Sequence, residues 1–114
     1  MGLSSSKEAF KLSGGKNKKE VVIPYGFTSI AEHAFLGHSS LTNVTIPNSV
    51  TSIGEHAFSG CSSLTNIAIP DSVTEIGKSA FEGCSSLTNI ITLGNVTKIG
   101  DNACPKTCTI VHLN

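Results

Sequence analysis

A 23-residue unit recurs through most of the chain, and this repeat constrains the fold more than any single motif. Residues 39–47 read SSLTNVTIP, residues 62–70 read SSLTNIAIP, and residues 85–90 begin a third copy. Self-similarity at a fixed period of about 20–30 residues is typical of solenoids, in which each unit buries its apolar face only against its neighbours. We therefore predict a repeat solenoid with one repeat in each coil.

Each repeat predicts one short strand followed by a return segment on the outside of the solenoid. Ile67 and Ile69 alternate with outward positions, which is the period-two pattern of a strand with one buried face. Pro70 follows directly and has no N–H to donate to a strand ladder, so we expect the strand to end there. Gly77 allows a sharp bend, and we expect a short helical or 3₁₀ segment to begin at Ala80.

Equal positions in successive coils form the predicted core. Stacked strands lie about 4.7–4.9 Å apart, so equivalent residues of successive repeats become neighbours in columns. Two columns of large apolar residues are expected, Ile30/Ile53/Ile76/Ile99 and Phe35/Phe58/Phe81. Cys61 and Cys84 form a further column and are predicted to pack as small buried apolar groups. Cys104 and Cys108 lie in an irregular last unit, where free thiols and a disulfide both fit the sequence.

The repeat resembles a known class, the leucine-rich repeats of BspA type. The matching string is L-x-x-[VI]-x-I-P-x-S-V-T-x-I-G-x-x-A-F-x-G-C-S-S, at residues 41–63 and 64–86. The resemblance covers residues 21–104 closely and the ends loosely. It implies a short right-handed superhelix with a parallel β-sheet on one face and 3₁₀ or irregular segments on the outer face. It also implies protein interaction or surface adhesion, without catalytic residues or cofactors.

The repeats divide the chain into three parts. Residues 1–20 are expected to form a polar segment and a degenerate capping turn, residues 21–103 the leucine-rich repeats, and residues 104–114 a partial repeat that caps the C-terminal end. In the capping turn, the dipeptide at residues 9–10 is aligned with the Ala-Phe pair at residues 34–35. Residues 110–113 are expected to form a fifth short strand.

The outward side of the predicted sheet is the candidate binding surface. The residues predicted to contact a protein partner are Asn43, Thr45, Asn66, Ala68, Asn89 and Ile91. Asn and Thr in flat columns suit a protein contact of modest apolar content. The alternative is that these polar side chains only keep the face soluble.

Charge and motif patterns exclude several function classes. The chain has eight lysines and no arginine, and no basic stripe follows the repeats, so we predict no nucleic-acid binding. The Glu-His pair at residues 32–33 recurs at residues 55–56, where stacked pairs are able to bind a metal or share a proton. Residues 78–79 do not continue the pattern, so repetition explains it, and we predict no enzyme, metal site or cofactor.

The N-terminus carries a lipidation motif. Residues 1–6 fit the pattern for N-myristoylation, with Gly2 as the acceptor, and a chance match is the alternative. One acyl chain binds membranes only marginally, and Lys16, Lys18 and Lys19 offer a second, electrostatic contact. The sequence lacks an apolar run of about 20 residues and an apolar signal core, so we predict a cytoplasmic protein, or an extracellular one if it is processed from a longer precursor.

These observations predict a non-enzymatic scaffold that binds a macromolecular partner through the sheet face. Two alternatives stay open. One is a fragment of a cell-surface adhesin, the role that the resemblance also implies. The other is a self-assembling solenoid that forms a homodimer through an unpaired strand near Leu113, because exposed strand edges readily pair with other chains.

Overall fold

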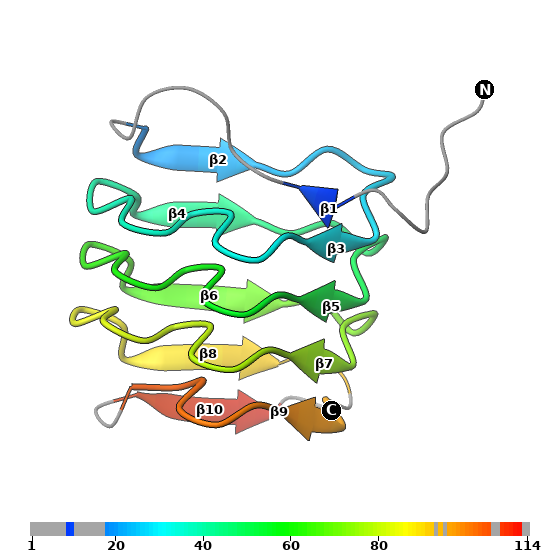
Figure 1. The fold of residues 1–114 in the computed structure, drawn as a ribbon. Helices are drawn as coiled ribbons and strands as arrows, with labels where there is room; N and C mark the ends of the chain where they lie inside the picture. The colour runs from blue at the N-terminus through cyan, green and yellow to red at the C-terminus, as the bar shows by residue number, and fades with distance from the viewer. Residues whose placement is uncertain (1–8, 11–17, 93, 95, 106–107, 113–114) are drawn as a thin grey trace.

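The computed structural model describes residues 9–10, 18–92, 94, 96–105 and 108–112, and within them the chain coils into a stack of short strands without a helix (Figure 1). Each repeat contributes two strands. The strands are β1 (Ala9–Phe10), β2 (Glu20–Val22), β3 (Ser29–Ile30), β4 (Asn43–Thr45), β5 (Ser52–Ile53), β6 (Asn66–Ile69), β7 (Glu75–Ile76), β8 (Asn89–Thr92), β9 (Lys98–Ile99) and β10 (Thr109–His112).

The strands lie in two rows, the even-numbered strands in one and the odd-numbered strands in the other (Figure 1). Every pairing is parallel and joins equivalent positions of successive repeats, as in Ile67↔Ile90 and Ile53↔Ile76. The even row confirms the predicted parallel sheet, and β10 confirms the predicted fifth strand. The odd row was not predicted, because strands of two residues are too short to show an alternating pattern.

The two rows differ in continuity. The odd row is one five-stranded sheet in the order β1-β3-β5-β7-β9. The even row consists of a two-stranded sheet, β2-β4, and a three-stranded sheet, β10-β8-β6. Within the described residues, no strand pairing joins β4 to β6. The even sheet is therefore interrupted at one position, between the second and third strands of the row.

The outer segments, which lead from β3 to β4, from β5 to β6 and from β7 to β8, consist of successive turns. The prediction of a helical or 3₁₀ segment at Ala80 was therefore wrong. In the first outer segment, alternate N–H groups donate to the next coil, from His33 to the Glu55 carbonyl at 3.0 Å and from Phe35 to the Ala57 carbonyl at 2.7 Å. The intervening N–H groups donate to the carbonyl three residues back. A helix needs all its N–H groups for internal hydrogen bonds. Hydrogen bonding between coils therefore replaces helix formation.

Stacked aromatic rings form the centre of the core. Phe35 and Phe58 lie 4.9 Å apart between ring centroids, and Phe58 and Phe81 lie 5.2 Å apart. All three side chains are fully buried, which confirms the predicted phenylalanine column. Ile99 lies in the predicted isoleucine column, paired with Ile76, but 44% of its surface is exposed. It lies on β9, where no further described strand of the odd row covers it.

Threonine hydroxyl groups connect neighbouring coils along the odd row. The Thr51 Oγ1 donates to the Thr28 carbonyl at 3.1 Å, Thr74 donates in the same way to Thr51 at 3.4 Å, and Thr97 to Thr74 at 3.2 Å. Each of these hydrogen bonds joins residues 23 positions apart, so threonine at one position of the repeat links each of these coils to the one before it. These threonines therefore have a structural reason to recur.

The first strand corrects the predicted N-terminal alignment. The backbone of Phe10 pairs with Ile30 and that of Ala9 with Ser29. The dipeptide at residues 9–10 is therefore equivalent to a strand of the odd row and not to the Ala-Phe pair at residues 34–35. Gly2 and Lys16, on which the predicted membrane contact rests, lie outside the described residues, and Lys18 and Lys19 are exposed.

The cysteines are all free thiols. Cys61 and Cys84 are fully buried, which confirms their predicted packing in the core. The Cys84 thiol also donates to the Phe58 carbonyl at 3.0 Å, and its interaction with the Cys61 thiol and its burial both raise the pKa of Cys84. Cys104 and Cys108 are half-buried and form no disulfide, and the Cys104 thiol donates a hydrogen bond to the Cys108 carbonyl at 3.6 Å.

The thiol of Cys108 is expected to react slowly in the folded protein. Burial and the neighbouring Cys104 thiol raise the pKa of Cys108 to about 12, from about 8.5 in an unfolded chain. Since the thiolate is the reactive form, alkylation by iodoacetamide at pH 8 should be much slower in buffer than in concentrated urea. Mass spectrometry after cleavage at Lys98 and Lys106 measures this, because the two C-terminal cysteines then lie on separate peptides.

The same pKa difference sets a direction for stability against pH. The neutral Cys108 thiol stabilises the fold fully below about pH 8.5, and this contribution is lost as the pH rises through about 12. Labelling of the folded protein should accelerate over the same range. Equal labelling rates with and without urea at pH 8 would contradict the assigned environment of Cys108.

Candidate interaction surface

Two columns of side chains cover the outward side of the even-numbered strands. On β4, the exposed Asn43 and Thr45 flank the buried Val44, and β6 repeats the pattern with Asn66 and Ala68 exposed. We call this surface the sheet face. Its outward residues are, in the first column, Glu20, Asn43, Asn66, Asn89 and Thr109, and, in the second column, Val22, Thr45, Ala68, Ile91 and Val111.

The structure brings the six predicted contact residues together on this face. Asn66 lies directly opposite Asn89, and Ala68 directly opposite Ile91, in the β6–β8 pairing. Five of the six are exposed, and Ile91 is half-buried. Val22, at one end of the second column, was not among the predicted contact residues, although 69% of its surface is exposed. Val22 precedes Thr45 and Ala68 in this column and Ile91 and Val111 follow them, so the column is more apolar than Thr45 and Ala68 alone suggest.

A hollow of about 310 Å³ lies on the sheet face at the interruption between β4 and β6. Four of the six predicted residues line it. The lining residues are Asn43, Val44, Thr45, Ile46, Asn48, Asn66, Ile67, Ala68 and Pro70. Three amide side chains and one hydroxyl supply both hydrogen-bond donors and acceptors, and no side chain in this lining carries a charge. The hollow is therefore suited to a neutral polar group.

Along the even row, backbone hydrogen bonding between coils is interrupted at the same place. The Thr42 N–H donates to the Lys19 carbonyl at 2.8 Å, and the Thr88 N–H donates to the Thr65 carbonyl at 3.0 Å. Between Thr65 and Thr42, at the boundary of β4 and β6, the described residues form no equivalent bond. Buried backbone groups are nearly always hydrogen-bonded, so groups left without a ladder partner are open to solvent or to a ligand. The interruption adds peptide donors and acceptors to the amides of the hollow.

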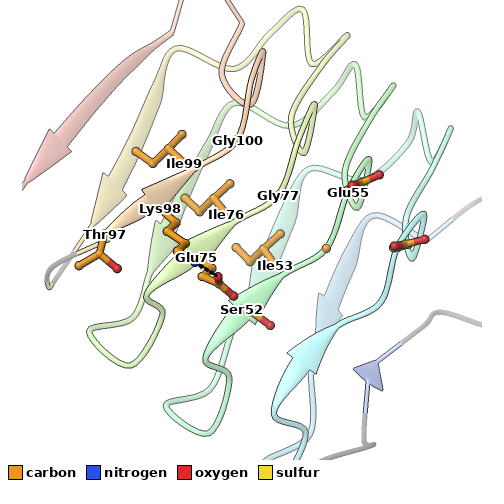
Figure 2. A pocket seen from close by; sticks show the side chains of 12 residues that line it. Ser52, Ile53, Glu55, Glu75, Ile76, Gly77, Thr97, Lys98, Ile99 and Gly100 are labelled. Atoms are coloured by element: carbon orange, nitrogen blue, oxygen red, sulfur yellow. Dashed lines mark ion pairs between the residues drawn. The ribbon is translucent and has the colours of Figure 1, made fainter.

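A second and larger hollow, of about 560 Å³, lies over the odd row (Figure 2). Figure 2 shows Ile53, Ile76 and Ile99 side by side on neighbouring strands. Glu75 and Lys98, which are paired on the neighbouring strands β7 and β9, form an ion pair at the hollow, with 3.6 Å between the Nζ and Oε2 atoms. Both side chains are more than half exposed, so the pair contributes at most about 1 kcal/mol.

Glycines are among the residues that line this second hollow. A Cβ atom built on Gly77 would lie 2.7 Å from the Glu55 nitrogen, and one on Gly54 would lie 2.7 Å from the Glu32 nitrogen. Close packing between coils therefore accounts for the glycines without a ligand. This hollow was not predicted from the sequence, because the odd-numbered strands that form it were not predicted.

Two features that mark other kinds of protein are absent from the part of the chain that the structure describes. They contain no cluster of three or more His, Cys, Asp or Glu residues that is able to hold a metal ion. Among them there is also no helix whose length and apolar character would let it cross a membrane.

A family profile decides how the repeats are classified. The profile of the BspA type leucine rich repeat region matches residues 5–114 in six copies. The chain belongs to the BspA-type leucine-rich repeat family. Members of this family are generally protein-interaction or surface proteins. No functionally curated protein matches this BspA-type chain.

Solved structures of bacterial leucine-rich repeat proteins share the fold. A protein from Eubacterium ventriosum has 29% identity and a TM-score of 0.76, over 85% of this chain and 27% of its own. The Treponema pallidum leucine-rich repeat protein has 35% identity and a TM-score of 0.71, over 75% and 40%. A leucine-rich cell surface protein from Faecalibacterium prausnitzii has 47% identity and a TM-score of 0.62, over 65% and 19%. The BspA-type chain thus spans less than half the length of each of these proteins.

Proposed function

We propose that this BspA-type chain is a non-enzymatic scaffold that binds a protein partner through the sheet face. The observation that carries the proposal is the coincidence of two features at one place. The uncharged hollow lined by Asn43, Thr45, Asn66 and Ala68 lies where strand pairing between β4 and β6 is interrupted. Amide side chains and backbone groups there offer hydrogen bonds, and the adjoining apolar column offers area for burial.

The composition of the face suits a protein contact. Interfaces that form and dissociate are about as apolar as ordinary protein surface, and charged residues are depleted at their centre. The centre of the sheet face has this character, because Asn66 and Ala68 are neutral and exposed, and only Glu20 at one end of the face carries a charge.

A negative charge in the middle of the face should abolish binding without unfolding the protein. Ala68→Glu places an unpaired carboxylate in the hollow, and we expect at least a tenfold loss of affinity for a partner isolated with the wild-type chain. Exposed substitutions usually change stability by less than about 0.5 kcal/mol, so the thermal melting curve should stay the same. Isothermal titration calorimetry and circular dichroism give the two readouts.

The matched control carries the same added charge elsewhere. Leu36→Glu changes an exposed residue in an outer segment and should bind the partner with wild-type affinity. Equal affinity of the Ala68→Glu and wild-type proteins would reject the sheet face as the contact surface. A folded Leu36→Glu protein that loses the partner would place the contact on the outer segments instead.

A cell-surface adhesin is the second candidate, and the name of the Faecalibacterium prausnitzii protein favours it. In that case antibodies against the chain label intact cells of its source, and protease added outside those cells removes the label. Labelling only after the cells are permeabilised would instead agree with the cytoplasmic location predicted from the sequence, which stays a prediction.

A further inference from the structure

Two histidines stack at the same bend of successive coils, outside the sheet face. The ring centroids of His33 and His56 lie 5.3 Å apart, and the rings are parallel to within 3°. Both residues have positive φ angles, of 62° and 54°, and Ser79 and Asn102 repeat this conformation in the next two coils. The bend therefore recurs at the same position of each repeat, and the shared backbone conformation gives both histidine side chains the same starting direction.

A carboxylate from a third coil lies beside this pair. The Oε1 atom of Glu82 is 3.9 Å from the Nδ1 atom of His56, whose side chain is 32% exposed. Repetition explains why His33 and His56 are alike, but it does not explain Glu82, because the equivalent positions hold Leu36 and Ser59. Histidines that bind metals commonly donate their second N–H to a carboxylate, which leaves the other nitrogen free as a ligand. At 3.9 Å the Glu82 carboxylate is an ion-pair neighbour of His56 and has to move closer to accept that hydrogen bond.

We propose that His33 and His56 form a two-imidazole site for a divalent transition-metal ion, with Glu82 orienting His56. Imidazole suits Zn²⁺, Cu²⁺ and Ni²⁺. With metal–nitrogen bonds of about 2.1 Å, two nitrogens on one ion lie at most about 4.2 Å apart. The ring centroids are 5.3 Å apart and the rings are parallel, so one or both rings have to turn for a nitrogen of each to reach the same ion. Since the described residues bring no third ligand to the pair, water or a ligand atom of a bound partner completes the coordination.

The test uses Ni²⁺ as the probe and the full chain. Isothermal titration calorimetry should give one site, and His33→Asn or His56→Asn should each weaken Ni²⁺ binding at least tenfold, because one imidazole no longer chelates. Asparagine is chosen because Asn102 already adopts the same backbone conformation in this protein. Glu82→Gln should also weaken binding, by about tenfold, as expected for a residue that orients a metal ligand.

The controls address the other groups that bind metals. His112→Gln and the double variant Cys104→Ser/Cys108→Ser should keep the wild-type affinity for Ni²⁺. In the unmodified protein, substoichiometric Cu²⁺ should broaden the imidazole proton resonances of His33 and His56 before those of His38, which is buried. Unchanged affinity in both histidine variants would overturn the proposal. Loss of binding in the cysteine variant would overturn it too, by assigning the metal to thiolates.

Discussion

Replacing Phe58 with alanine is expected to lower the free energy of unfolding by about 3–5 kcal/mol, the usual cost of removing a large buried side chain. Phe58 is fully buried and stacks on Phe35 on one side and on Phe81 on the other. Its removal leaves a cavity that interrupts the aromatic column between the first and last coils. Because each coil of a solenoid contacts only its neighbours, no distant residue compensates for the loss.

Urea unfolding followed by far-ultraviolet circular dichroism measures this effect. Val22→Ala is the matched control, since it also shortens an apolar side chain but at a site that is 69% exposed, and we expect a change within about 0.5 kcal/mol. If the Phe58→Ala and Val22→Ala proteins unfold at the same urea concentration, the phenylalanine column does not have the stabilising role assigned to it.

Gly77→Ala is expected to destabilise the protein by about 1–3 kcal/mol, although the change adds a single methyl group. The added Cβ would lie 2.7 Å from the Glu55 nitrogen and 2.7 Å from the Gly54 carbonyl carbon. Both are backbone atoms of the preceding coil, so the two coils have to move apart. That movement lengthens the hydrogen bond from the Gly77 N–H to the Ile53 carbonyl, now 2.8 Å.

The first coil supplies the control for this prediction. Ala31 stands at the position equivalent to Gly54 and Gly77. Ala31→Gly removes a methyl group and relieves no crowding, so its cost should be only about 0.5–1 kcal/mol, from the greater freedom of the unfolded chain. Thermal melts of both variants test the comparison. A Gly77→Ala protein as stable as Ala31→Gly would show that the coils are less tightly packed than the structure indicates.

Period and polarity were enough to predict the stacked coils, the buried columns and the outward residues of the even-numbered strands. A 23-residue period makes every equivalent residue a neighbour, so the phenylalanine and cysteine columns follow from the spacing alone. Alternation around Ile67 then separates buried from outward positions, which is why Asn66 and Ala68 were placed on the exposed face.

Features set by the contact of one coil with the next were not predictable. The odd-numbered strands, such as Ser52–Ile53, are too short for alternation, and their pairing depends on where the neighbouring coil lies. The alignment of Phe10 with Phe35 was wrong because Phe10 pairs with Ile30, only 20 residues further on, so the 23-residue period does not extend into the first coil. The interruption between β4 and β6 has no signal in the sequence, because Asn43–Thr45 and Asn66–Ile69 read as equivalent strands.

The interruption between β4 and β6 has a mechanical consequence. The odd row continues past this boundary without a break, whereas the even row has no ladder across it. A force that bends the stack should therefore separate β4 from β6 before it separates the paired odd-numbered strands. We therefore expect the curvature of the stack to change most readily at this boundary.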